Sequence, residues 1–404
     1  MPEGNLYAIY FARDEFQRLI ANFRRFLFRC DLAAYARRYE SEFRKFLRWS
    51  RSVHRRNLRA LSRDDFARLF SELSRRLVDF AELQFLAFVV LEGPGRELEE
   101  LMSHQPDGQD LLQVVATPYR ETKITRARTE LMRLAAAGRP TSRRLSAYVQ
   151  RYAWLPVYEF IDLPLRVADI QDQIRQMNDP MPELRRYRRQ RRENLHRYRK
   201  LLASIRKPRV RRLVQIMHSW AYLKEMRDDY RRHAYYLLIP FWHELARRVG
   251  LPFIQTNYLT TDELLDILTT GRVPDQKRIA ARQRRYAISL RQGRLHVYSG
   301  ARAGQLMRLV ASPSTGAVVR GVPACSGRAN GRVKVIFHRG EFKKFKSGEV
   351  LVTTMTHPEF VLVMRRASAV VTDEGGMTCH AAIVSRELNI PCIEGIGGSL
   401  LYLV

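Results

Sequence analysis

One histidine in this 404-residue sequence, His380, stands where a glycine-rich turn meets an apolar segment. Residues 368–372 are rich in β-forming side chains and predict a buried strand before that turn. Gly375 and Gly376 end the run and allow backbone angles that other residues avoid. A histidine in this setting can act as a nucleophile and carry a phosphoryl group, because the N–H groups at a helix start favour an anion.

The residues after the histidine predict the helix that would supply those N–H groups. Apolar residues recur over 381–388, Asn389 suits the left-handed position after a helix, and Pro391 blocks continuation. We predict Thr378 as the N-cap, which places His380 in the first helical turn. The positive end of the helix dipole disfavours the imidazolium form, so the ring is expected to stay neutral, as a nucleophile must.

Other residues near His380 have alternative interpretations. Cys379 is either a reactive thiol or a small residue packed under the turn, and we favour packing. Arg386 lies on the same predicted helix, too far along it to reach a phosphate, so packing or surface pairing is expected. His338 and His357 are weaker candidates, because neither opens a helix after a pair of glycines.

Four segments of the last quarter of the chain carry a family resemblance. They are Gly321–Val335, Gly348–Thr353, Thr356–Ala367 and Thr372–Glu387. Together they resemble the phosphohistidine-carrying swivelling, or mobile, domain of the PEP-utilising enzymes. That family includes phosphoenolpyruvate synthase, pyruvate phosphate dikinase and rifampicin phosphotransferase. The resemblance implies a β/α domain and a phosphotransferase activity in which His380 is the catalytic residue.

The same resemblance implies supporting roles for residues around the histidine. The residues implied for the turn and for phosphate binding are Gly375, Gly376, Thr378, Cys379, Thr356 and Glu374. Dikinase-type enzymes use the position of Thr378 for regulatory phosphorylation, although helix capping is the role we favour here.

The rest of the chain departs from the family pattern. Members carry an ATP-grasp domain that loads the histidine, and some carry a barrel that unloads it; we find neither. The glycines before residue 271 are too scattered for a phosphate-binding loop, and they are Gly4, Gly93, Gly95, Gly108, Gly138 and Gly250. The family domain also continues past Ile393, so residues 400–404 either supply a last strand or the domain is truncated.

These departures predict partners. We expect a separate ATP-grasp or PEP/pyruvate-binding protein, with ATP, Mg²⁺ and phosphoenolpyruvate or pyruvate bound there. We expect no metal site and no cofactor on this chain itself.

Length and composition predict two or three domains in a cytoplasmic setting. An apolar content of 46% is ample for packed cores, and four cysteines are too few for a disulfide framework. The sequence does not begin like a signal peptide, and its longest strongly apolar run, Phe85–Leu91, is too short to span a bilayer.

The overall pattern predicts a multidomain α plus α/β protein. Residues 1–250 are predicted to be mostly helical, residues 251–316 a helical segment with a hinge linker, and residues 317–404 the swivelling domain. The hinge is placed at 299–304 and 312–316, which are rich in Gly, Ser and Pro.

Local signals mark several boundaries in the helical region. Ser62 and Thr260 or Thr261 suit helix starts, and residues 138–142 suit a break. Gly93-Pro94-Gly95 predicts a turn between helices. Three short segments resemble landmarks of the helical region that precedes the swivelling domain in the family, namely Tyr152–Leu155, Arg227–Tyr230 and Tyr258–Leu264.

The formal net charge of +30 belongs mainly to the helical region. Between Arg185 and Arg212, Glu193 is the single acid among many arginines and lysines, with Tyr187 and Tyr198 interleaved. Such a face either binds nucleic acid or another polyanion through its phosphates, or is simply a solvated, arginine-rich helix pair.

Two classes of function follow from these observations. In the first, the chain is the phosphotransferase component of a split enzyme and His380 carries the phosphoryl group between a donor site and an acceptor site. In the second, it is a non-catalytic family remnant whose basic helical region binds a partner, nucleic acid or another polyanion.

Overall fold

The computed structural model describes residues 12–138, 140–175, 177, 179–291, 294–310, 318–337, 339–356, 360–373, 375 and 379–396. The chain divides into two compact units. One is residues 17–275, called the helical body below, and the other combines residues 276–404 with residues 1–16. No helix among the described residues combines the length and the apolar character that a bilayer crossing needs.

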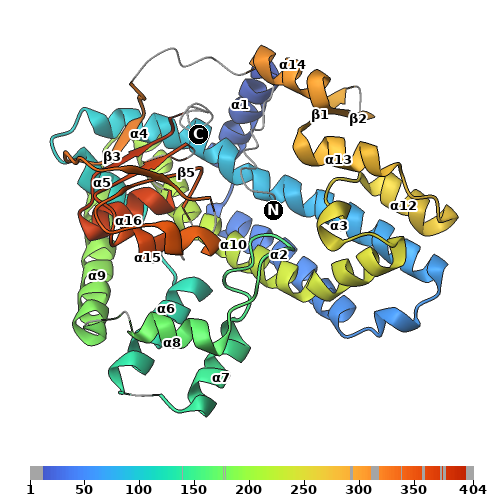
Figure 1. Cartoon of the computed structure of the whole chain (residues 1–404). Coiled ribbons are helices and arrows are strands. Elements are labelled where there is room, and N and C mark those ends of the chain that lie inside the picture. Colours follow the sequence, from blue (N-terminus) through green and yellow to red (C-terminus); the bar gives the residue numbers. More distant parts are fainter. Residues whose placement is uncertain are drawn as a thin grey trace. The chain divides into compact units, whose positions relative to one another are not determined.

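The helical body consists of helices joined by short connections, as predicted (Figure 1). Its elements are α1 (Arg13–Arg29), α2 (Leu32–His54), the 3₁₀ turn η1 (Leu58–Ala60), α3 (Arg63–Val90), the π-helical η2 (Leu91–Gly95), α4 (Arg96–Ser103), α5 (Gly108–Val115), α6 (Lys123–Ala136), α7 (Ser142–Tyr152), α8 (Val167–Arg175), α9 (Pro180–Ser204), α10 (Pro208–Val249), α11 (Phe253–Thr256) and α12 (Thr261–Thr270).

Capping side chains explain several of these helix starts. The Ser62 hydroxyl accepts the Asp65 N–H at 3.1 Å and begins α3. Thr260 begins α12, where Glu263 returns a bond to the Thr260 N–H and completes a capping box. The predicted starts at Ser62 and Thr260 are therefore confirmed, as is the break between α6 and α7.

The core of the body forms where the long α10 packs against α2 and α3. Aromatic side chains dominate that contact. The Phe66 and Phe241 rings stack with centroids 4.8 Å apart, and Tyr39 lies 5.3 Å from Trp220. Large buried rings of this kind contribute most of the burial free energy of a helical core.

The segment Gly93-Pro94-Gly95 is helical, which corrects the predicted turn. Residues 91–95 form a π-helical stretch between α3 and α4. The wider π spacing accommodates Pro94, which has no N–H to donate. A Cβ on Gly93 would lie 2.7 Å from Ile20 Cγ2, so the first helix packs against this stretch at close range.

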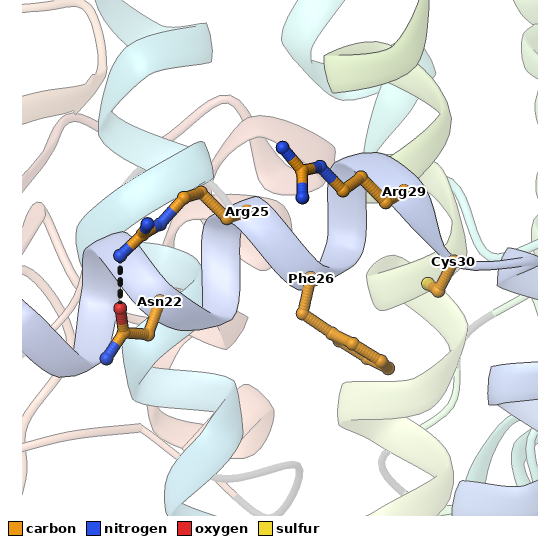
Figure 2. Close-up of a pocket in the computed structure, with 5 residues that line it drawn as sticks. All are labelled: Asn22, Arg25, Phe26, Arg29 and Cys30. Atoms are coloured by element: carbon orange, nitrogen blue, oxygen red, sulfur yellow. Dashed lines mark hydrogen bonds between the residues drawn. The ribbon is translucent and has the colours of Figure 1, made fainter.

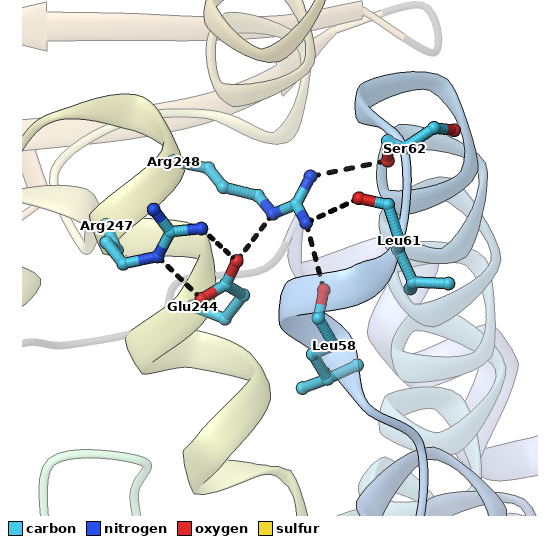
Figure 3. A network of polar contacts seen from close by, with 6 residues as sticks. All are labelled: Leu58, Leu61, Ser62, Glu244, Arg247 and Arg248. Atoms are coloured by element: carbon cyan, nitrogen blue, oxygen red, sulfur yellow. Dashed lines mark hydrogen bonds and ion pairs between the residues drawn. The ribbon is translucent and has the colours of Figure 1, made fainter.

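Arginine side chains connect the ends of several helices through hydrogen bonds to backbone carbonyls. Figure 3 shows Arg248 on α10 donating to the carbonyls of Leu58 and Leu61, at 2.9 and 2.8 Å, and to that of Ser62 at 3.3 Å. Glu244 holds Arg248 and Arg247 at 2.7 and 2.6 Å. The hydrogen bond from Arg247, helped by Arg248, lowers the pKa of Glu244 to about 2.

Residues 276–310 contain a β-hairpin that was not predicted. Helix α13 (Gln276–Arg284) precedes strands β1 (Tyr286–Arg291) and β2 (Arg294–Ser299), which pair antiparallel, and helix α14 (Gly300–Val310) follows. The predicted hinge at 299–304 is thus the end of β2 and the start of α14, because Ala301, Arg302 and Ala303 favour helix. The hinge predicted at 312–316 lies outside the described residues.

Among the described residues from 318 to 396, five strands form a mixed sheet, as predicted for a β/α domain (Figure 1). The strand order is β3-β7-β6-β5-β4, with β3 antiparallel to β7 and the other pairs parallel. Its elements are β3 (Val322–Cys325), β4 (Val333–Val335), the 3₁₀ helix η3 (Arg339–Lys344), β5 (Val350–Thr353), α15 (Val361–Met364), β6 (Ala369–Thr372), α16 (His380–Leu388) and β7 (Cys392–Glu394). Strands β4, β5, β6 and β7 lie side by side in the order of the sequence. Right-handed crossovers between them therefore place α15 and α16 on the same face of the sheet.

Candidate functional site

The sheet topology brings three segments to one edge. Strands β5, β6 and β7 are parallel neighbours, so their carboxyl ends meet at that edge. Thr356 follows β5, His380 follows β6, and Glu394 is the last residue of β7. The carboxyl edge of parallel strands is where open α/β sheets place their ligands.

His380 is the first residue of α16 and is hydrogen-bonded to Thr356. Its Nδ1 lies 2.8 Å from the Thr356 hydroxyl. Thr356 is 2% exposed, whereas His380 is partly exposed. A buried hydroxyl therefore fixes the orientation of a ring that solvent can reach. This geometry is compatible with the predictions of His380 as the catalytic residue and Thr356 as a supporting residue.

The cap of α16 is Cys379, which corrects the predicted N-cap at Thr378. The Ala382 N–H points to Cys379 Sγ at 3.5 Å, and the helix begins at His380. The Cys379 thiol in turn donates to Glu394 Oε1 at 2.7 Å. Sulfur can take this role because its longer bonds reach both the N–H and the neighbouring strand. Cys379 is thus the last residue of the turn that leads into α16.

Glu394 is a site residue that the sequence analysis missed. It is completely buried, and its carboxylate accepts a hydrogen bond from the thiol of Cys379, which caps α16. A Cβ on Gly375 would lie 3.0 Å from Glu394 Oε2 and 3.2 Å from Cys379 Sγ. Gly375 also has φ +142, so both its backbone angle and its surroundings require glycine. The signal available in the sequence was a single acid in the apolar stretch 390–396.

Four of the residues named from the sequence lie outside the described residues of this edge, namely Glu374, Gly376, Thr378 and His357. His338 also lies outside the described residues. The described residues between β6 and α16 are therefore Asp373, Gly375 and Cys379.

Arg386, near the end of α16, packs against strand β3. Its guanidinium donates to the Ala324 carbonyl of β3 at 3.1 Å, which agrees with the predicted packing role. Burial lowers the pKa of Arg386, while Glu394 acts against that fall. Burial also raises the pKa of the Cys392 thiol to about 12, and the Glu394 carboxylate adds to the rise. Cys392 therefore stays protonated in the folded chain at neutral pH.

The helical body has a hollow beside α1. Figure 2 shows its lining, which is Asn22, Arg25, Phe26 and Arg29 on α1 and Cys30 directly after that helix, around a volume of about 550 Å³. None of the residues predicted from the sequence to do chemistry lines it. We therefore place the candidate active site at the sheet edge.

The comparison with protein families identifies the C-terminal region. The family model "PEP-utilising enzyme, mobile domain" matches residues 345–402, which include Thr356, His380 and Glu394. The C-terminal region of this chain is therefore a mobile domain of the PEP-utilising enzyme family, as the resemblance implied.

Proteins similar to this chain are named phosphoenolpyruvate synthases. The probable phosphoenolpyruvate synthase of Archaeoglobus fulgidus is 58% identical over 78 residues, which is 19% of this chain and 10% of the relative. The Aeropyrum pernix enzyme is 58% identical over 88 residues, 22% of this chain and 11% of the relative. The Pyrococcus furiosus enzyme is 35% identical over 158 residues, 38% of this chain and 19% of the relative.

These alignments cover a small part of each relative, and one of them extends beyond the mobile domain of this chain. The chain spans only a tenth to a fifth of the length of these relatives. The alignment with the Pyrococcus furiosus enzyme covers 158 residues, more than residues 317–404 contain, so similarity continues upstream of the mobile domain.

Proposed function

We propose that this chain is the phosphotransferase component of a PEP synthase-like system and that His380 carries the phosphoryl group. The observation that supports this most is the hydrogen bond between His380 Nδ1 and the buried Thr356 hydroxyl at the carboxyl edge of a mobile domain. We assign the phosphoryl group to Nε2, because Nδ1 is already engaged.

The bonds, electrons and protons of this transfer balance as follows. The Nε2 lone pair attacks the phosphorus of the donor and forms an N–P bond, while the P–O bond to the leaving group breaks. The leaving oxygen keeps that electron pair, and Nδ1 keeps its proton, shared with Thr356 Oγ1. In the second transfer an oxygen of the acceptor attacks the phosphorus and forms a P–O bond, while the N–P bond breaks and Nε2 recovers its lone pair, which leaves the imidazole neutral.

The structure of the turn supplies the electrostatic part of the proposal. His380 and Ala381 are the first two residues of α16, where backbone N–H groups have no partner within the helix. These N–H groups and the positive dipole end favour the negative charge of a phosphoryl group. Because Gly375 has no side chain, Cys379 and Glu394 can lie close to the backbone of the turn.

The donor and acceptor sites are proposed to lie on other proteins. The relatives carry the name phosphoenolpyruvate synthase, so ATP with Mg²⁺ on one side and phosphoenolpyruvate or pyruvate on the other are the proposed small molecules. A separate ATP-grasp or PEP/pyruvate-binding protein is the proposed partner. A reducing cytoplasm is the proposed setting, in which the four free cysteines remain thiols.

The test is phosphate incorporation into the purified chain, read by intact mass. The chain is incubated with ATP or with phosphoenolpyruvate, each with and without lysate of the host. The proposal expects acid-labile, base-stable phosphate that disappears in His380→Ala and persists in His104→Ala, which removes an exposed histidine of the body. Unchanged incorporation in His380→Ala contradicts it. So does the absence of incorporation under every condition from a chain shown to be folded, and that result favours the non-catalytic alternative.

A further inference from the structure

The arginines of the helical body fall into two groups. Many donate to backbone carbonyls at helix ends, as Arg248 does, and as Arg212 does to the Leu27 carbonyl at 2.6 Å. Those on the outer face of α9 (Pro180–Ser204) do not follow this pattern. We call the exposed set Arg185, Arg189, Arg192, His196 and Arg199 the α9 row.

The spacing of the α9 row makes it one straight line. Its members follow one another at intervals of four, three, four and three residues, which keeps them on a single helical face. From Arg185 to Arg199 this line extends about 21 Å at 1.5 Å per residue. Arg186 and Lys200 are also exposed and flank it.

The row is almost without acids. Arg189 has an ion pair with Glu193 at 3.8 Å, and both side chains are more than half exposed. Arg185, Arg192 and Arg199 form no ion pair with any described residue. Like charges three and four residues apart destabilise a helix by roughly 0.2–0.5 kcal/mol for each pair. A polyanion along the row would remove that repulsion.

The aromatic residues of α9 point into the body. The Tyr198 ring stacks on His218 with centroids 3.5 Å apart, and Arg128 lies 5.8 Å from the ring of Tyr187. Neither ring is on the exposed row, so the surface lacks the stacking platform that single-stranded nucleic acids use. The row also contains no apolar residue that could insert into a lipid surface.

We propose that the α9 row binds the sugar–phosphate backbone of double-stranded DNA without reading its sequence. A stiff line of cations matches a stiff array of phosphates, and an arginine fork can hold a phosphate through two hydrogen bonds. This binding is additional to phosphoryl transfer and does not depend on His380.

The experiment measures the affinity of the full chain for a labelled 24-base-pair DNA by fluorescence anisotropy over a range of salt concentrations. The row variant replaces Arg185, Arg189, Arg192 and Arg199 with Gln. The control variant replaces Arg38, Arg55, Arg56 and Arg59, four exposed arginines elsewhere on the body, with Gln. Both variants lose the same charge, and exposed substitutions of this kind leave the fold intact.

The proposal expects the slope of log K against log salt to become shallower by about 3 to 4 in the row variant, since each lost phosphate contact contributes about 0.9. The control variant keeps a slope close to that of the parent chain. Equal losses in the two variants would show that net charge alone drives binding and would overturn the proposal. It would equally be overturned by a tenfold preference for duplex RNA of the same sequence, or by binding to anionic phospholipid vesicles with none to DNA.

Discussion

The helical body and the mobile domain use buried charge in different ways. In the body, Arg232 is 1% exposed, donates to the Leu155 carbonyl at 2.6 Å and lies 3.6 Å from the centroid of the Tyr158 ring. In the mobile domain, the buried Glu394 instead holds the thiol of Cys379 beside the candidate catalytic helix.

The buried charges of the two regions therefore have different roles. Arginines in the body satisfy carbonyls that helix ends and loops leave without a donor, so they act on stability. Glu394 fixes the cap of the helix that begins with His380, so it acts on the geometry of the site. Body variants should therefore change unfolding and spare phosphate incorporation, whereas edge variants should change the site.

The largest effect is expected for Arg232→Met. The substitution removes the hydrogen bond to the Leu155 carbonyl, and it also removes a buried positive charge that lies among other charged groups. The free energy of unfolding should therefore fall by about 3 kcal/mol. Arg199→Met, on the exposed row, should change it by less than about 0.5 kcal/mol. Urea denaturation measures both, and equal losses would remove the distinction between the two groups of arginines.

The stability of the body should also fall at acidic pH because of His233. This ring stacks on Trp154 at 5.1 Å, and burial lowers its pKa to about 3. Because the unfolded chain binds the proton more readily, the stability that His233 contributes is complete above pH 6.5 and is lost as the pH falls toward 3. Between pH 7 and pH 5 the loss should reach about 2 kcal/mol.

His233→Phe keeps the stacking and should remove that loss. Burial raises the pKa of the nearby Asp229 to about 7, which gives a slope of the opposite sign between pH 4 and pH 7. The informative quantity is therefore the difference in unfolding free energy between the parent chain and His233→Phe at each pH. A difference that does not change with pH would contradict this assignment.

In the mobile domain, Glu394→Gln should loosen the start of α16. The carboxylate that receives the Cys379 thiol loses its charge, and the local opening free energy should fall by about 2 kcal/mol. Hydrogen exchange of peptides covering 380–388 would then be roughly 30-fold faster. Cys379→Ser, whose hydroxyl can keep both the cap and the donor, should stay near the parent rate. Unchanged protection in Glu394→Gln would show that this contact does not support the helix start.

The smallest of these effects concerns the orientation of the histidine. Thr356→Val removes the hydroxyl 2.8 Å from His380 Nδ1 and should slow phosphate incorporation about tenfold. Thr356→Ser keeps the hydroxyl and should retain the parent rate. Rates of phosphate incorporation, measured by mass at short times, separate the two outcomes. If valine and serine behave alike, the hydrogen bond does not orient the nucleophile.

Local signals predicted the parts of this site that depend on neighbouring residues. The strand before the turn, the helix of 380–388 and the left-handed Asn389 follow from a few residues each, and the structure has all three. Glu394 could not be predicted in this way. Its role depends on β7 lying beside β6, and strand order is a long-range property that short patterns do not contain.

The corrected elements show where packing overrides local preference. Gly93-Pro94-Gly95 has the composition of a turn, yet Pro94 and Gly95 are buried within a π-helical stretch. The strands β1 and β2 show period-two alternation in residues such as Ile288 and Leu290, a signal that the sequence analysis overlooked. At the histidine turn, Cys379 replaces Thr378 as the cap because Glu394 lies within reach of its thiol.

The most direct test of the account is to locate the phosphate on the modified chain. Fragmentation at alkaline pH should place it on His380, and ³¹P–¹⁵N coupling in the ¹⁵N-histidine-labelled protein should place it on Nε2. Phosphate on Nδ1, which Thr356 holds in this structure, or on a residue other than His380, would contradict the central claim.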